Sequence, residues 1–280
     1  MNPEAVLSGT EKQVDMAEPP VARYAPMSKP VESEFLKHGS GYNPDVYWES
    51  TEASYPHYPT VRHRKRFIMN AIGSATLPAN FTVFDFGCGE ASLLKSIQKK
   101  FNLKDDQLGG CDVSGHAVVS AKLKLKSPYL YHAAFPTCPR TFDVMVCSEV
   151  IEHTRDYRNI LEWMYRNLTP GGLLILTTQA GKIHGSDRYT GHTQHFDRKA
   201  LTQLLKDIGY KVEKSYLWGW PFFTLQKYMT DHRFEQIQQN YLEGNLSLRK
   251  KIVFKLAFVA YLLHDLIAFG PQIYITARKL

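Results

Sequence analysis

The sequence predicts an α/β fold in which a mostly parallel sheet is flanked by helices. Three observations lead to this prediction. Strand-like and helix-like runs alternate through the middle of the chain, a glycine turn follows the first strand-like run, and an aspartate ends the second. In such a sheet the carboxyl ends of parallel strands gather at one edge, where ligands bind.

The individual elements follow from the spacing of apolar residues. Strands are expected where short apolar runs end in Asp, Ser, Gly or Gln, and helices where apolar residues recur at helical spacing. The expected strands are TVFDF (82–86), LGGCD (108–112), FDVMVCS (142–148), GGLLILTTQ (171–179), residues 210–217 and QIYITARKL (272–280). The expected helices cover residues 91–101, 115–125, 155–167 and 198–208, and a long stretch within 222–269.

Composition shifts along the chain suggest its organisation. Residues 1–40 mix Pro, Glu, Ser and Lys with little apolar periodicity, so we expect a mobile N-terminal leader. Residues 41–280 are expected to form one domain. Within it, the aromatic and basic segment 41–72, helical from about residue 60, is expected to form a lid, and residues 218–270 a helical substrate cover.

The overall composition permits several partners. The chain has 280 residues, 44% of them hydrophobic, which is enough to bury a sizeable core. Its net charge of +7 comes from dispersed basic residues, typical of a solvated surface but also compatible with anionic partners. The four cysteines lack C-x-x-C spacing and no secretory pattern opens the sequence, so we expect a cytoplasmic protein.

The glycine turn indicates the kind of ligand. Asp85, Gly87 and Gly89 follow the first strand, where glycines let the backbone approach a ligand closely. Asp112 ends the second strand, where a carboxylate can bind ribose hydroxyls. A carboxylate at position 85 would repel a pyrophosphate and attract an ammonium or sulfonium group, which favours S-adenosylmethionine. The alternative is that these residues only shape tight turns, with Asp112 capping the next helix.

Residues 60–217 resemble the class I S-adenosylmethionine-dependent methyltransferases. The resemblance rests on the D-x-G-x-G turn, the downstream Asp112, and the runs FDVMVCSEVIEH and LTPGGLLILTTQ. It implies a Rossmann-like fold with a mostly parallel seven-stranded sheet and a helical insertion after strand six. The chain departs from the family pattern in lacking the third glycine of the turn and the Asp often found near adenine, in the loop 134–141.

The resemblance also assigns roles to particular residues. Asp85, Gly87 and Gly89 would line the methionine part of the cofactor, and Asp112 would bind the ribose. Arg64 resembles an arginine that some quinone-pathway methyltransferases use for the methionine carboxylate. The residues that end the fourth strand, Ser148 and Glu149, would lie beside the cofactor.

A hydroxyl acceptor requires a base or a metal to remove its proton. The motif EVIEH contributes Glu149, Glu152 and His153 after the fourth strand, and GHTQHF contributes His192 and His195 after the fifth. Carboxylates and imidazoles together suit a divalent metal.

The E-x-x-E-H motif resembles the metal site of small-RNA 3′-terminal 2′-O-methyltransferases, and a related cluster occurs in quinone-pathway O-methyltransferases. This resemblance implies that Glu149, Glu152, His153 and His192 bind Mg²⁺ or another divalent metal. Without a metal, the candidate catalytic bases are His153, His192 and His195, since an imidazole titrates near neutral pH. His57 and His63 are weaker candidates.

Two apolar segments follow the sixth strand. The aromatic residues of LWGWPFFTLQKY either wall an acceptor pocket or pack the inserted helices onto the sheet. Lys255, His264 and Asp265 interrupt the apolar run 250–270, which argues against a membrane span. Interior packing is expected for this run, with a dimer face or an interfacial helix as alternatives.

Together these features predict a methyltransferase that acts on oxygen in a small hydroxylated metabolite, such as a natural product, a sugar or a quinone-like ring. N- or C-methylation, 2′-O-methylation of an RNA 3′ end, and a non-catalytic S-adenosylmethionine-binding partner protein remain open. The basic residues are dispersed and no RNA-binding motif is recognisable, so nucleic acid is not the expected partner. A transient membrane-surface contact and a homodimer are further expectations.

Overall fold

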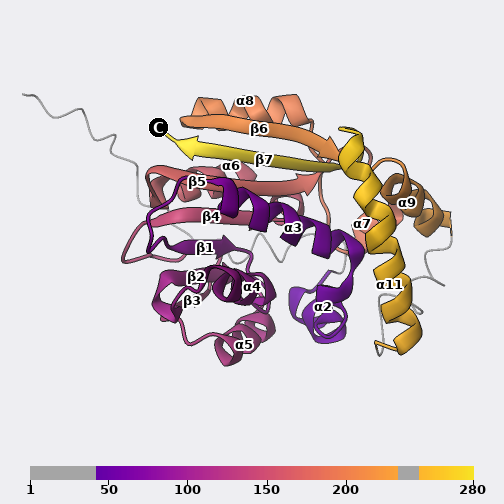
Figure 1. Cartoon of the computed structure of the whole chain (residues 1–280), viewed down its shortest axis with the longest axis horizontal. Coiled ribbons are helices and arrows are strands. Elements are labelled where there is room, and N and C mark those ends of the chain that lie inside the picture. The colour runs from indigo at the N-terminus through magenta and orange to yellow at the C-terminus, as the bar shows by residue number, and fades with distance from the viewer. Residues whose placement is uncertain (1–41, 233–245) are drawn as a thin grey trace, which may run out of the picture. The chain divides into compact units, whose positions relative to one another are not determined.

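The computed structural model describes residues 42–232 and 246–280, and these form a Rossmann-like arrangement around one seven-stranded sheet (Figure 1). The expected leader lies outside the described residues. The strands are β1 (Val83–Phe86), β2 (Leu108–Asp112), β3 (Tyr129–His132), β4 (Phe142–Ser148), β5 (Leu168–Gln179), β6 (Tyr210–Trp218) and β7 (Gln272–Lys279). Their order is β3-β2-β1-β4-β5-β7-β6, and β7 alone runs opposite to the other six strands. The predicted fold class is confirmed.

Helices cover both faces of the sheet, because successive strand residues point to opposite sides. On one face, Phe84 and Phe86 of β1 pack in a core with α6 (Tyr157–Asn167) and α8 (Arg198–Ile208). On the other face, Val83 packs in a core with α3 (Pro59–Ser74), α4 (Ser92–Phe101) and α5 (Gly115–Lys124). Continuous burial of β1, β2 and most of β4 explains why these strands read as apolar runs.

The remaining described helices gather near the carboxyl ends of the central strands. They are α2 (Pro44–Thr51), α7 (Gly185–Tyr189), α9 (Phe222–His232) and α11 (Leu248–Ala260), with short 3₁₀ turns η1 (Tyr55–His57), η3 (Ile151–His153) and η5 (Tyr261–Leu266). A further 3₁₀ turn, η2 (Asp105–Gln107), lies at the opposite edge, directly before β2. Figure 1 shows α2, α9 and α11 at the end of the sheet to which the arrowheads of β4 and β5 point. A ligand bound at this edge would therefore be enclosed by helices.

Besides α2, which lies before the expected start of helix near residue 60, two elements were not recognised from the apolar pattern. In the edge strand β3 only Leu130 is buried, so YLYH shows little of the alternation that marks a strand. The helix α7 has five residues, too few for helical periodicity to be visible. The sequences of these two short elements are therefore not enough to predict them.

The expectation that the apolar run 250–270 packs in the interior is wrong. Phe254, Tyr261 and His264 are buried, but most of the other apolar side chains of α11 and η5 face outward. Among the described residues, no helix combines the length and apolar character needed to cross a bilayer. The middle of the expected long helix, residues 233–245, lies outside the described residues.

Candidate functional site

The glycine turn is tied to the end of the neighbouring strand. Gly87 and Gly89 have φ angles of 76° and 52°, which glycine adopts without steric penalty. The Gly87 amide donates to the Cys111 carbonyl over 2.8 Å, and the Gly89 amide donates to Asp112 Oδ2 over 2.8 Å. A Cβ on Gly89 would lie 2.3 Å from a ring carbon of Trp48, so the turn needs glycine for close approach as well as for its backbone conformation.

Two buried carboxyl groups lie next to this turn. Asp85 is 3% exposed, and burial together with the charge of Asp112 raises its pKa well above the usual range. Burial also raises the pKa of Asp112, although the backbone amides of Ser114 and Gly89 oppose this rise by hydrogen bonding to its carboxylate. A positively charged ligand would relieve the repulsion between the two carboxylates. Asp112 lines the adjacent cavity, whereas Asp85 lies outside its lining.

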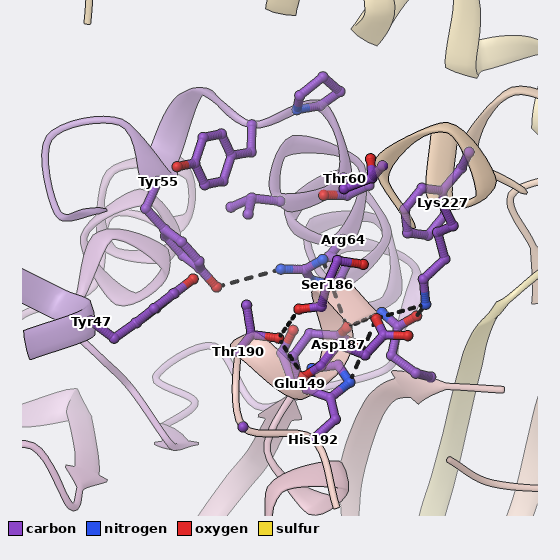
Figure 2. A pocket seen from close by; sticks show the side chains of 18 of the residues that line it. Tyr47, Tyr55, Thr60, Arg64, Glu149, Ser186, Asp187, Thr190, His192 and Lys227 are labelled. Atoms are coloured by element: carbon purple, nitrogen blue, oxygen red, sulfur yellow. Dashed lines mark hydrogen bonds and ion pairs between the residues drawn. The ribbon is translucent and has the colours of Figure 1, made fainter. Parts of the chain in front are cut away.

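A cavity of about 700 Å³ extends from the turn across the carboxyl ends of the strands (Figure 2). Gly87, Asp112, Ser148 and Glu149 contribute to its strand-side lining. The rings that enclose it come from α2, η1, α9 and α11 and from the residues beside them, namely Tyr42, Tyr47, Trp48, Tyr55, Tyr58, Phe222, Phe223, Phe254 and Tyr261. Strand ends thus supply the polar groups and helices supply the apolar walls.

Glu149 lines the cavity, and its side chain is held by neighbouring polar groups. Its φ of 58° is unusual for a residue with a side chain. The Glu149 carboxylate accepts hydrogen bonds from Thr177 (3.0 Å), Gln179 (2.5 Å) and Gln272 (2.6 Å). Arg64 Nη1 lies 3.9 Å from Glu149 Oε2, and Arg64 Nη2 donates to the Tyr55 hydroxyl over 3.4 Å (Figure 2). Burial acts to raise the pKa of Glu149, but Arg64 and the hydrogen bonds outweigh it and lower that pKa.

Glu152 and His153 present unsatisfied ligand atoms. Glu152 is fully buried and accepts a hydrogen bond from Thr178 Oγ1 over 2.7 Å. Its other oxygen, Oε1, and His153 Nδ1 have no hydrogen-bond partner among the described residues. Burial and the charge of Glu149 raise the pKa of Glu152 well above its usual range, while burial lowers the pKa of His153 to about 4.

These atoms fit a divalent cation. One ligand atom from each of Glu152, His153 and His192 lies within 4.8 Å of the others. The fourth expected ligand, Glu149, is not in this group. Its oxygens instead face Arg64 and accept three hydrogen bonds. The structure therefore brings together three of the four expected metal ligands.

Behind His192 lies a polar network that sequence reasoning missed. Asp187 Oδ1 is 3.0 Å from Lys227 Nζ, and Asp187 Oδ2 is 3.6 Å from His195 Nε2. His195 Nε2 in turn lies 3.1 Å from His192 Nδ1. His192, Asp187 and Lys227 line the cavity, whereas His195 does not and has a nearly inaccessible side chain. The concentration of His and Asp in the loop after β5 is the sequence signal that could have identified Asp187.

The weaker histidine candidates lie outside the cavity lining. His57 is in η1, and His63 is within hydrogen-bonding distance of the Phe258 carbonyl of α11, at 2.9 Å. The two interpretations of the aromatic segment each apply to part of it. Phe222 and Phe223 line the cavity, whereas Trp218 packs in a small core cluster and does not line it.

Comparisons with known proteins agree with this geometry. A family model described as "Methyltransferase domain" matches residues 60–215, more than half of the chain. A protein of Mycolicibacterium smegmatis named "Probable S-adenosylmethionine-dependent methyltransferase" is 27% identical over 141 residues, which cover 47% of this chain and 52% of that protein. The ubiquinone biosynthesis O-methyltransferase of Nitrosomonas europaea is 26% identical over 140 residues, which cover 47% of this chain and 57% of the relative. The chain thus spans about half the length of these curated relatives.

A solved structure supports the fold alone. Phosphoethanolamine N-methyltransferase 2 of Haemonchus contortus, in complex with phosphomonomethylethanolamine and S-adenosylhomocysteine, aligns with a TM-score of 0.55 at 18% identity. The alignment covers 89% of this chain and 60% of the other. With the family model spanning residues 60–215 and the strand order described above, the chain belongs to the class I S-adenosylmethionine-dependent methyltransferases.

Proposed function

We propose that the protein transfers a methyl group from S-adenosylmethionine to an oxygen of a small hydroxylated acceptor, such as a natural product, a sugar or a quinone-like ring. The observation that carries this proposal is that one cavity is lined both by the cofactor-type residues Gly87 and Asp112 and by the imidazoles of His153 and His192. Methyl transfer needs donor and acceptor side by side in such an enclosed space.

The residues at the strand ends fit the cofactor. Asp85, Asp112 and Glu149 form an acidic surrounding for its positive charges, and Arg64 would hold its carboxylate. Ser148 lines the same cavity, and its Oγ lies 2.9 Å from Thr177 Oγ1. When bound, S-adenosylmethionine supplies an electrophilic methyl group that needs no further activation. The protein's task is to orient the acceptor and to remove its proton.

His192 is the proposed base. Burial first, and then the positive character of neighbouring groups, lowers its pKa well below the usual value, so the imidazole is neutral at pH 7 and can accept a proton. In the tautomer that donates from Nδ1 to His195, Nε2 keeps its lone pair for the acceptor hydroxyl. Asp187, held by Lys227, would stabilise the imidazolium that forms.

A metal-assisted variant of the same reaction is favoured by the unsatisfied Glu152 Oε1 and His153 Nδ1. Glu152, His153 and His192 would hold a divalent cation, which would lower the pKa of a bound hydroxyl. Titration of the protein with Mn²⁺ should then show a binding isotherm that Glu152→Gln abolishes. A wild-type protein that takes up no Mn²⁺ or Mg²⁺ would leave His192 to act alone.

In this proposal, two segments of the chain cover the site. Residues 41–72 would act as a lid, since Tyr47, Trp48 and Tyr55 enclose the cofactor side of the cavity. Residues 218–270 would cover the acceptor, through Phe223, Phe254 and their neighbours. The O-methyltransferase relative supports oxygen as the acceptor atom. The alternatives to be tested are N- or C-methylation, methylation of an RNA 3′ end, and a non-catalytic binding role.

The test is transfer of a labelled methyl group from S-adenosylmethionine into fractionated host extract, with Mg²⁺ and with chelator. We expect label in a small-molecule fraction, its loss in His192→Ala, and its loss in Asp85→Ala, which serves as the cofactor-binding blank. Label that survives His192→Ala would favour an N- or C-acceptor. Tight cofactor binding without any labelled product would contradict the enzymatic proposal, and label in RNA would redirect it.

A further inference from the structure

The helix α11 and the turn η5 present an exposed apolar surface. Leu256 is 65% exposed, Val259 55% and Leu266 80%, and most of the other large apolar side chains of this segment are likewise accessible. Leaving so many branched side chains in water is unfavourable, and contiguous surfaces of this kind mark interaction sites.

The same surface is cationic. Arg249, Lys251 and Lys255 are exposed along α11, and the described segment 246–264 contains no acidic residue. The acid that follows, Asp265, is already paired, because it accepts hydrogen bonds from both terminal nitrogens of Arg66, at 2.6 and 2.7 Å. Exposed apolar side chains beside lysine and arginine favour binding to an anionic membrane, because both apolar burial and attraction to anionic lipids add to the binding strength.

This surface is continuous with the cavity. Leu225 and Met229 of α9 and Val253 of α11 are exposed and also line the cavity, so its apolar lining reaches the outside between these helices. Figure 1 shows α9 and α11 on the same side of the molecule, and α9 contacts η5. A molecule dissolved in a bilayer against α11 would therefore meet an apolar route inward.

We propose that α11, η5 and the exposed side of α9 form a docking surface for an anionic lipid bilayer, from which an apolar acceptor enters the cavity. The entry of the acceptor rests on the proposed function, whereas the docking does not. A second copy of the chain is a poorer occupant, because an isologous contact would bring two cationic surfaces together with no acid of this described segment to compensate them.

The test is flotation of the full-length protein with vesicles of phosphatidylcholine alone or with about one-third phosphatidylglycerol, without cofactor or acceptor. We expect binding to the anionic vesicles that falls with salt. Leu256→Glu, and separately Lys251→Glu with Lys255→Glu, should weaken binding about tenfold or more. The matched control is Leu123→Glu, which changes a leucine of α5 that is 74% exposed and should leave binding unchanged.

Absence of binding to anionic vesicles would overturn the proposal, as would equal losses in Leu256→Glu and Leu123→Glu. A dimer that Leu256→Glu dissociates, with no vesicle binding, would assign the surface to a second copy instead. Methyl label confined to water-soluble products would overturn the entry of an apolar acceptor while leaving the docking intact. Because flotation needs no catalysis, vesicle binding by a protein that transfers no methyl group would refute the proposed function alone.

Discussion

Asp85 is a residue whose charge depends on what binds beside it. Its carboxyl group is buried next to Asp112, and both burial and that neighbouring charge raise its pKa well above the usual value. A cationic ligand adds an opposing interaction that favours the ionised form and lowers the pKa. Binding of such a ligand therefore releases a proton at pH values between the pKa of the ligand-bound protein and that of the free protein.

Affinity for S-adenosylmethionine should accordingly rise with pH until the pKa of free Asp85 is passed. Asp85→Asn should weaken binding by about tenfold or more at neutral pH and flatten this dependence, because the attraction to the ligand cation is lost. Calorimetric titrations at several pH values would measure both effects, with the exposed Asp106→Asn as control. Equal affinity of wild type and Asp85→Asn would show that the carboxylate does not face the cofactor.

At the level of secondary-structure elements, hydrogen bonds hold α2 against the start of α5, beside the glycine turn. Asp45 of α2 accepts hydrogen bonds from the Ser114 hydroxyl (2.6 Å) and the His116 amide (3.0 Å) at the start of α5. At the other end of the helix, Glu52 accepts one from Lys124 over 3.0 Å. Trp48 of the same helix lies against the glycine turn, so the position of α2 and the shape of the turn depend on each other.

The substitution Gly89→Ala tests whether the position of α2 and the shape of the glycine turn depend on each other. The new methyl group would collide with the Trp48 ring and would also occupy a positive-φ position, so we expect a loss of about 1–3 kcal/mol in unfolding free energy and weaker cofactor binding. Gly171→Ala is the matched control, because its φ is 71° but no atom lies within 4 Å of its added Cβ.

A double-mutant cycle separates the two contributions of Gly89→Ala. Adding Trp48→Ala should recover the part of the loss that comes from the collision and leave the backbone part, which Gly171→Ala estimates. Denaturant unfolding provides the measurement. Strict additivity of Gly89→Ala and Trp48→Ala would mean that α2 moves away freely and does not depend on the turn.

In the molecule as a whole, some buried ionisable groups make the folded state more stable as the pH rises, and others make it less stable. Burial lowers the pKa values of His63 and His264 to about 4, so the folded state binds fewer protons than the unfolded state below about pH 6.5. Their contribution is complete at neutral pH and is lost as the pH falls from about 6.5 to 4. Asp85 and Glu152, whose pKa values are raised by burial, act in the opposite sense.

The contribution of His264 to this pH dependence can be separated from the others by comparing the stability of a His264 variant with that of the wild type. At pH 7, His264→Gln should melt below the wild type, because His264 Nε2 accepts a 3.1 Å hydrogen bond from the Phe222 amide and packs against Trp218. As the pH falls toward 4, the wild type loses the contribution of His264 and the gap should close. Thermal melts across this range, with the exposed His132→Gln as control, would reveal a constant gap if the pKa of His264 were the same in the folded and unfolded states.

Three features could be predicted from the sequence: the alternation of strands and helices, the glycine turn with Asp112 on the next strand, and the family. These features are local or regularly spaced, so hydrophobic periodicity and the special backbone of glycine reveal them directly. The expected helix at 198–208 has the bounds of α8, because Asp197 caps its first turn and Gly209 ends it. The gathering of Glu152, His153 and His192 followed from the rule that strand ends meet at one edge.

Contacts between groups that are far apart in the chain could not be predicted, because they depend on how the whole chain folds. Trp48 against Gly89, Lys227 against Asp187, and the three donors that occupy Glu149 are contacts between distant segments, and no local pattern encodes them. The run 250–270 has an apolar composition that suits both a buried and an exposed helix. Its exposure was decided by how little of its surface the rest of the fold covers, which depends on the packing of every neighbouring element.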